Sequence, residues 1–168
     1  MNCQICNKPT VTPSGYKESK ILIIRDAPHK TEYPSHKSNR FRSETTPLTV
    51  LRAELFRLGV DLVQIRRANL WMHAPNKKAE ECFQDGINSC LAEAKGKGAI
   101  LLFGADTVKY FTGYNVSEVS GLQVESNMLS APIIYACLDP SAALFKGMGE
   151  VRFGIENFIK KVISEDIL

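Results

Sequence analysis

Cysteine and histidine residues at metal-ligand spacing are the first side chains in this sequence that could do chemistry. Cys3 and Cys6 form a CxxC pair, a spacing that lets two thiolates bind one metal ion. One such pair supplies only half of a tetrahedral site, and the candidates for the other ligands are His73, Cys82 and Cys90. Free thiols are the alternative, because five cysteines in a protein expected to be cytoplasmic are not expected to form disulfides.

A carboxylate follows the first strongly apolar run of the chain. Residues 21–24 read Ile-Leu-Ile-Ile, which is typical of a strand buried on both faces of a sheet, and Asp26 comes where this strand ends. Pro28 then fixes φ and removes a backbone donor, so the chain must turn. Ligands of open parallel sheets bind beyond the carboxyl ends of the strands, and Asp26 is therefore expected at the rim of such a crevice.

Two more polar side chains are predicted at strand ends. Asn69 lies near the end of a second predicted strand, residues 62–70. Its amide either bonds to neighbouring loop backbone or offers a donor and an acceptor to a ligand. Asp139 directly follows another predicted strand, residues 132–138, so two strands of the predicted sheet end on an aspartate.

A long polar segment, residues 29–45, joins the first strand to the first predicted helix. It is rich in basic side chains and contains one phenylalanine, Phe41. Such a segment is either a solvated flap or a basic lid with an aromatic platform for a base or a phosphate-bearing ligand.

The elements that must position these residues alternate along the chain. The predicted strands cover residues 21–24, 62–70, 99–103 and 132–138, and the predicted helices cover residues 47–58, 79–95, 106–111 and 150–163. This alternation predicts an α/β fold, a three-layer α/β/α sandwich with a central four-stranded parallel sheet. Residues 1–168 are expected to form a single domain, in which residues 1–19 are a CxxC segment and linker.

Composition limits the function classes. The chain is 44% hydrophobic and 23% charged, as in ordinary globular domains, and its net charge of +3 permits a nucleic-acid partner without arguing for one. No run approaches the ~18 apolar residues of a membrane span, and the first residues lack the basic-then-apolar pattern of a signal peptide. We expect a cytoplasmic protein that has no membrane partner.

Five segments, in order, resemble motifs of the uracil-DNA glycosylase superfamily, and within it the iron–sulfur type. The family motifs are Gly-Glu-Ala-Pro-Gly, Gly-Arg-Pro-Phe, Thr-Asn before Lys-Cys-Arg-Pro, Leu-Gly opening a short helix that ends on Leu-Gly, and His-Pro-Ser. The corresponding segments here are 25–29 (Arg-Asp-Ala-Pro-His), 38–41 (Ser-Asn-Arg-Phe), 68–75 (Ala-Asn-Leu-Trp-Met-His-Ala-Pro), 103–113 and 139–141 (Asp-Pro-Ser). Each departs from the family motif at one or more positions.

The resemblance implies a DNA glycosylase that excises uracil or a related damaged base by hydrolysis of the N-glycosidic bond. Such an enzyme takes the base out of the stack and holds its face and edge. By similarity, Ala27, Phe41 and Asn69 would bind the base, with Phe41 stacking on it and Asn69 reading its edge. Asp26 would position water and stabilise the cationic sugar.

The same resemblance raises a difficulty at Asp139. Family members have a histidine there that donates a hydrogen bond to the departing uracil, whereas an ionised carboxylate has no proton to donate. Loss of such a donor typically costs ~100- to 1,000-fold in rate. The missing hydrogen bond could come from a neutral Asp139 with a raised pKa, or from His29 or His36, and these alternatives stay open.

The family also implies a 4Fe–4S cluster held by four cysteines. Cys3, Cys6 and Cys82 match three of them, and His73 stands where the remaining one would be. Histidine ligates iron in some clusters, but zinc with the same ligands suits these residues equally well. Cys90 is an outside candidate for the fourth position.

DNA is the partner that the resemblance implies. The expected DNA contacts are Arg40, Arg66, Ser120, Gly121 and Ser141, where Ser120 replaces the arginine usual in the family's minor-groove loop. A replication or repair protein could compensate for the missing charge. The alternative function is a non-catalytic relative that acts as a DNA-binding or DNA polymerase accessory module.

Overall fold

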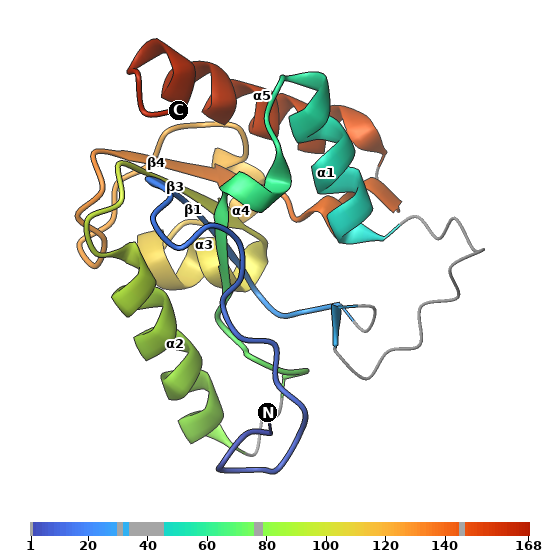
Figure 1. Ribbon diagram of the computed structural model, residues 1–168, viewed down its shortest axis with the longest axis vertical. Coiled ribbons are helices and arrows are strands. Elements are labelled where there is room, and N and C mark those ends of the chain that lie inside the picture. The colour runs from blue at the N-terminus through green and yellow to red at the C-terminus, as the bar shows by residue number, and fades with distance from the viewer. Residues whose placement is uncertain (1, 30–31, 34–45, 76–78, 145–146) are drawn as a thin grey trace.

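The computed structural model of this chain describes residues 2–29, 32–33, 46–75, 79–144 and 147–168 (Figure 1). In chain order the elements are β1 (Ile21–Arg25), α1 (Pro47–Arg57), the 3-10 helix η2 (Leu62–Gln64), β2 (Arg66–Asn69), α2 (Glu80–Ala94), β3 (Ala99–Phe103), α3 (Ala105–Thr112), α4 (Val116–Val119), β4 (Ile133–Cys137), the 3-10 helix η3 (Pro140–Leu144) and α5 (Met148–Ser164). The strands form one parallel sheet in the order β2-β1-β3-β4.

Helices cover both faces of this sheet (Figure 1). Ile21 and Ile23 of β1 pack into a core with α1 and α5, whereas Leu22 and Ile24 pack on the opposite face with α2 and α3. Successive residues of the strand point alternately into these two cores, which is why β1 is apolar at every position from 21 to 24. The predicted three-layer α/β/α sandwich is confirmed.

Helix α1 begins as its sequence predicts. The Thr46 side chain accepts from the Thr49 backbone N–H, and Pro47 occupies the first turn, where no backbone donor is needed. Leu51 and Leu55 are fully buried against β1, and Gly59 follows the helix with a φ of 80°. This helix lies over the face of the sheet on which Asn69 lies.

The second predicted strand is wrong over its first half. Asp61 accepts a hydrogen bond from the Val63 N–H and starts a 3-10 turn instead, so the strand runs only from Arg66 to Asn69. This turn changes the direction of the chain before β2, which pairs with β1 so that Asn69 lies beside Arg25.

The residues expected to form a linker make contacts with β2 and with the loop after it. Ser14 forms an antiparallel bridge with Arg67, and the Val11 N–H donates to the Met72 carbonyl at 2.6 Å. This segment therefore runs along β2, one of the two edge strands of the sheet, and it brings the CxxC pair to the loop that follows β2.

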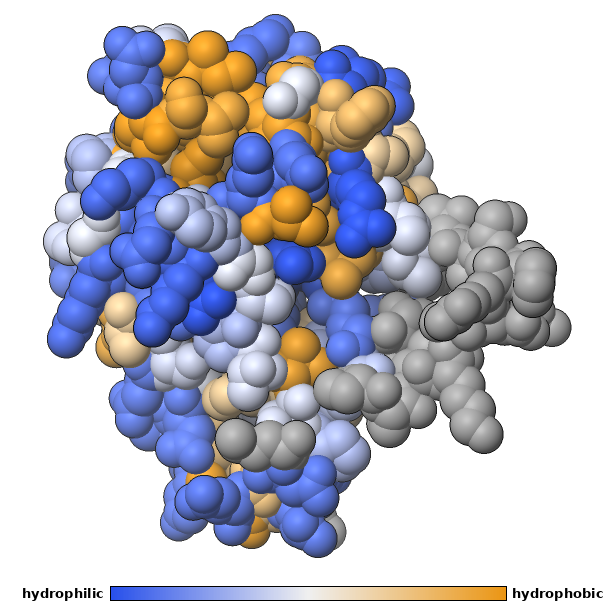
Figure 2. All heavy atoms as spheres, viewed as in Figure 1, coloured by the Kyte–Doolittle hydropathy of each residue, from blue (hydrophilic) through white to orange (hydrophobic). Residues whose placement is uncertain are grey.

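Polar side chains cover much of the surface seen in Figure 2, and apolar ones gather in its upper part, where α5 lies. The exposed large apolar side chains of α5 are Phe153 and Ile163. No helix in the described part of the chain has both the length and the apolar character needed to cross a membrane.

Candidate functional site

The CxxC pair lies in a tight loop at the amino end of the chain. An antiparallel bridge between Asn2 and Pro9 closes this loop, and the Asn7 N–H donates to the Cys3 carbonyl at 2.8 Å. Asn7 adopts a φ of 60°, a conformation that asparagine tolerates better than most residues. The loop thus turns both thiols toward one side.

His73 and Cys82 reach the same point from the loop after β2 and from the first turn of α2. The Cys3 and Cys82 sulfurs lie 3.7 Å apart, and Cys6 Sγ lies 3.4 Å from His73 Nε2. All four ligand atoms lie within 4.8 Å of one another, and His73 and Cys82 are buried. The structure therefore brings together the four metal ligands that the sequence predicted, and they could bind a metal ion.

The protonation of His73 suits a ligand role. Its Nδ1 lies 2.7 Å from the Ala74 carbonyl oxygen, which can only accept, so Nδ1 carries the proton. In the neutral ring with this tautomer, Nε2 is the nitrogen with a free lone pair, and it faces Cys6. Proteins usually orient a metal-binding histidine by a hydrogen bond of this kind, in which the ring nitrogen that does not bind the metal donates to a carbonyl.

The thiols of the cluster differ in acidity. Burial alone raises the pKa of Cys3, but backbone N–H groups of Cys6 and Ile5 and contacts from Cys82 and His73 lower it to about 6. Burial, together with the nearby Cys3 and Cys6 sulfurs, raises the pKa of Cys82 to about 12. Cys3 is thus poised as a thiolate, and a cation would offset the repulsion that opposes ionisation of Cys82.

A separate cavity of about 290 Å³ opens where β1 and β2 end, on the α1 side of the sheet. Its lining residues are Val11, Ser14, Arg25, Glu32, Leu48, Arg52, Arg67, Ala68 and Asn69. The Asn69 side chain is 9% exposed and has no hydrogen-bond partner among the described residues. Its amide donor and acceptor are thus available to a ligand in this cavity.

Arg25 organises one wall of the cavity. Its Nη1 donates to both carboxylate oxygens of Glu32 at 3.0 and 2.9 Å, and its Nε donates to Asp139 Oδ2 at 3.2 Å. These carboxylates raise the pKa of Arg25 against the opposing effect of its burial. The Arg25 guanidinium therefore stays charged and joins the ends of β1 and β4.

Asp26 points to a different place from Asn69. It follows Arg25 on the opposite face of β1, and its carboxylate accepts from the backbone N–H of Thr107 at 2.7 Å and from the Thr107 hydroxyl. The Asp106 N–H lies 3.4 Å from its other oxygen. Asp26 thus caps the first turn of α3, and burial raises its pKa although these hydrogen bonds oppose the rise.

The structure does not gather all the residues expected to bind the base. Asn69 lines the cavity, whereas Asp26 is not among its lining residues and Ala27 packs against the core on the α2 side. Phe41 lies outside the described residues. Asn69 and Arg25 are therefore the pair that the fold brings together here.

The residues expected to contact DNA fall into two places. Ser120 Oγ accepts from the Leu138 N–H, and Ser141 donates its N–H to Asp139, so both lie near the end of β4. Arg66 lies at the other end of its strand, where it forms two hydrogen bonds of 2.8 Å with Glu93. Arg40 lies outside the described residues.

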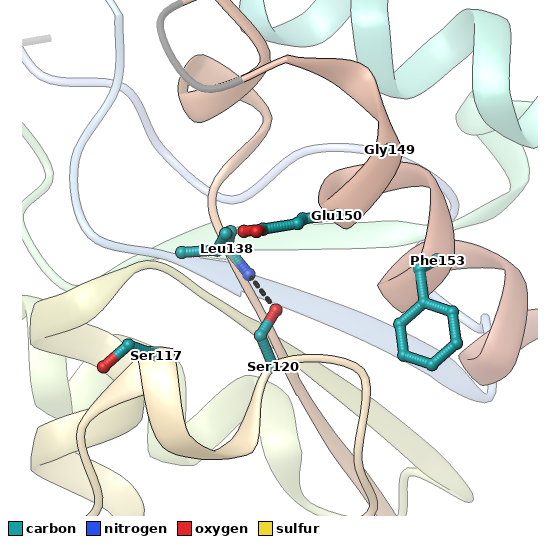
Figure 3. Close-up of a pocket in the computed structure, with 6 residues that line it drawn as sticks. All are labelled: Ser117, Ser120, Leu138, Gly149, Glu150 and Phe153. Carbon is teal, nitrogen blue, oxygen red and sulfur yellow. Dashed lines mark hydrogen bonds between the residues drawn. The ribbon is translucent and has the colours of Figure 1, made fainter.

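A larger cavity, of about 490 Å³, lies beside Ser120 (Figure 3). Ser117, Ser120 and Leu138 line it on one side and Gly149, Glu150 and Phe153 of α5 on the other. Gly121, with a φ of 84°, lets the chain pass under the Phe153 ring. The charged side chain lining this cavity is the acidic Glu150, which does not favour a phosphate backbone.

Sequence reasoning missed Arg25 and Arg52 of the smaller cavity. Arg25 stands where the family motif has its first glycine, and that replacement is the signal that could have found it. Arg52 carries no such signal, because it lies on an amphipathic helix.

Known proteins give no further guidance: no family model matches the chain, and no curated protein matches it either.

Proposed function

We propose that this protein is a uracil-DNA glycosylase-like, DNA-binding protein that holds an extruded pyrimidine in the cavity lined by Asn69. The observation that carries the proposal is the convergence of Cys3, Cys6, His73 and Cys82. These are the ligands that the resemblance assigned residue by residue, including the histidine in place of a cysteine. Their meeting in space supports the resemblance as a whole.

The cavity supports base binding independently of the metal centre. The Asn69 amide lines the cavity and bonds to no described residue, and a pyrimidine edge offers both the acceptor and the donor that would pair with it. Arg25 lies at the wall of the same cavity, and its Nη2 group makes no hydrogen bond to any described residue. That group could donate to the oxygen of a departing base, the role for which Asp139 is unsuited.

A non-catalytic DNA-binding module is the second candidate, and two contacts favour it. Asp26 already accepts hydrogen bonds from Thr107 as a helix cap, and Asp139 is paired with Arg25. Both carboxylates that the resemblance placed in catalysis thus have structural partners. A protein that binds a flipped base without cutting it needs neither of them free.

We propose zinc as the metal, in preference to a 4Fe–4S cluster. Sulfur ligands bound to one zinc ion at ~2.3 Å in a tetrahedron stand ~3.8 Å apart. The Cys3 and Cys82 sulfurs lie 3.7 Å apart, and none of the four ligand atoms is more than 4.8 Å from another. A cubane cluster binds each ligand to a different iron and would hold the ligands further apart.

Excision from a defined oligonucleotide tests the main proposal. Purified protein is incubated with single- and double-stranded uracil-containing DNA, and abasic sites are then cleaved with alkali. We expect cleavage at the uracil, reduced at least 100-fold in Asn69→Ala and unchanged in Asn88→Ala, a control on the exposed side of α2. Binding without cleavage would favour the non-catalytic module, and neither binding nor cleavage would refute both.

A metal analysis of the same preparation tests the zinc proposal. One zinc per chain and a colourless protein are expected. A brown protein, with about four iron atoms and four sulfides per chain, would replace zinc by the cluster.

A further inference from the structure

Arg67 presents a charged group that the described part of the chain leaves without a partner. Its Nε is buried and makes no hydrogen bond, and no ion pair is formed by its guanidinium. Burial lowers the pKa of Arg67, and the nearby Arg52 and Arg25 lower it further, while Glu32 opposes them. A half-buried arginine in such a position is destabilising unless something with negative charge meets it.

Arg52 stands across the same cavity from Arg67. It lies on α1, is exposed and forms no ion pair or hydrogen bond with a described residue. Among the described residues, the only carboxylate lining the cavity is that of Glu32, which two hydrogen bonds from Arg25 already engage. The guanidinium groups of Arg52 and Arg67 therefore face the cavity with no described carboxylate bonded to either of them, because Glu32, whose charge acts on Arg67, is hydrogen-bonded to Arg25.

We propose that this cavity binds a phosphate group between Arg52 and Arg67. Guanidinium is the side chain that matches phosphate oxygens in pairs, and two arginines without partners at one cavity provide such pairs. The chain has no glycine-rich phosphate loop, so this site uses side chains in place of backbone N–H groups. No DNA or excision is needed for the binding to occur.

The phosphate belongs to a nucleotide, a step that rests on the proposed function. Arg67 and Asn69 are two residues apart on β2, so their side chains leave the same face of the sheet about 7 Å apart. That separation suits a nucleotide whose base edge meets Asn69 while its phosphate meets Arg67. A cavity of about 290 Å³ accommodates a single nucleotide.

Binding of inorganic phosphate and of deoxyuridine 5′-monophosphate, measured by calorimetry at constant ionic strength, tests the site. We expect both to bind to the wild type, and Arg52→Gln and Arg67→Gln each to weaken the binding at least 10-fold. Arg57→Gln is the matched control, because it removes the same charge from α1 at a residue paired with Glu54 and Glu156. Equal binding by all four proteins, or binding by none, would overturn the site.

A thermal measurement covers the case in which Arg67→Gln folds poorly. Arg67→Met removes the unpaired charge but keeps the apolar stem, so in phosphate-free buffer it should melt about 3 °C higher than the wild type. Phosphate should raise the melting temperature of the wild type and not that of Arg67→Met. If phosphate raises both equally, the anion does not bind at Arg67 and the proposal fails.

The source of the phosphate is read from two oligonucleotides that differ only in a 5′-terminal phosphate. If the phosphorylated strand binds more tightly and Arg52→Gln removes this difference, the cavity binds a phosphate monoester. If both strands bind equally and Arg52→Gln weakens the binding of both, the cavity binds a backbone diester. If Arg52→Gln leaves the affinity for both strands unchanged, the site is refuted. Inorganic phosphate binding with no uracil excision would leave the site standing while the glycosylase proposal falls.

Discussion

Arg25, the last residue of β1, donates its Nε hydrogen to Asp139 Oδ2 at 3.2 Å, although the two residues are 114 positions apart in the chain. This contact ties the ends of two strands that are not neighbours in the sheet. It also places a positive charge beside Asp139, the residue at the position where the glycosylase motif that this segment resembles has a histidine. Under the proposed function, Arg25 could therefore supply the hydrogen bond that Asp139 cannot donate.

This pair predicts opposite effects on base excision. If Arg25 is the donor, Arg25→Gln should slow uracil release about 100-fold, whereas Asp139→Asn should speed it by removing a negative charge near the departing base. The amide oxygen introduced by Asp139→Asn would still accept the Ser141 N–H. Single-turnover rates with a uracil oligonucleotide measure both. Equal slowing by the two substitutions would show that the ion pair matters only for folding.

Asp26 is predicted to stabilise the protein through α3. Asp26→Ala removes the acceptor for the Thr107 N–H and hydroxyl and should lower the free energy of unfolding by about 1–2 kcal/mol. Asp26→Asn keeps an acceptor oxygen and should cost less. Urea unfolding measures both variants. If neither changes stability while Asp26→Asn abolishes excision, Asp26 acts in catalysis and not as a cap.

Two cysteines of α2 form a matched pair for the metal centre. Cys82 belongs to the ligand cluster, whereas Cys90, on the same helix and also buried, does not. Cys82→Ala should abolish metal binding, and Cys90→Ala should leave one metal per chain. A chelator should lower the melting temperature of the wild type and of Cys90→Ala alike, but not that of Cys82→Ala. Metal loss in Cys90→Ala would make Cys90 a ligand.

Much of the fold follows from local sequence, and the reason is visible in the strands. β3 occupies the predicted residues, because an apolar run between a turn and Gly104 has only one place in a parallel sheet. The predicted strand at residues 62–70 is longer than β2. Asp61 starts a 3-10 turn in the apolar run, and β2 itself is an edge strand that begins with Arg66 and Arg67. An edge strand with polar residues lacks the continuous apolar run that identifies a buried strand such as β3.

The candidate site also has a part that the sequence predicts and a part that it does not. The CxxC pair is recognisable from its spacing, which leaves His73, Cys82 and Cys90 as candidates for the other ligands, and the family resemblance selects His73 and Cys82 among them. The partners in the cavity could not be predicted, since Arg25, Arg52 and Arg67 come from three elements and meet only after the sheet forms. Asp26 and Asn69 are expected together because both lie at strand ends, yet Asn69 pairs with Arg25, and Asp26, the next residue along the chain, points to the opposite face.

Gly86 has a role that its helix propensity does not suggest. A Cβ there would overlap the Leu70 carbonyl oxygen, because α2 packs directly on the backbone that follows β2. Gly86→Ala should therefore lower the free energy of unfolding by about 3 kcal/mol, although alanine is the better helix former. The control is Gly149→Ala in α5, where a Cβ meets nothing within 4 Å and stability should rise by up to about 1 kcal/mol. Similar effects of both substitutions in chemical denaturation would contradict the packing argument.

Glu54 predicts how stability depends on pH. Its carboxylate is buried between α1 and α5, where it accepts from Arg152 at 3.0 Å and from Arg57 at 3.1 Å. Burial raises its pKa, but the hydrogen bonds and charges of the two arginines outweigh that effect and lower the pKa below 4.5. A carboxylate with a lowered folded-state pKa stabilises the protein above its unfolded pKa, and this stabilisation is lost as pH falls through the folded value.

Glu54→Gln should therefore cost about 1–2 kcal/mol at pH 7, and the difference from the wild type should shrink as the pH falls below about 4. The measurement is the free energy of unfolding in urea between pH 3 and 7. Glu80→Gln is the control, because Glu80 is exposed at the start of α2 and forms no ion pair with the described residues, so its profile should follow the wild type. A difference between wild type and Glu54→Gln that stays constant over this pH range would mean that Glu54 contributes by packing and not by charge.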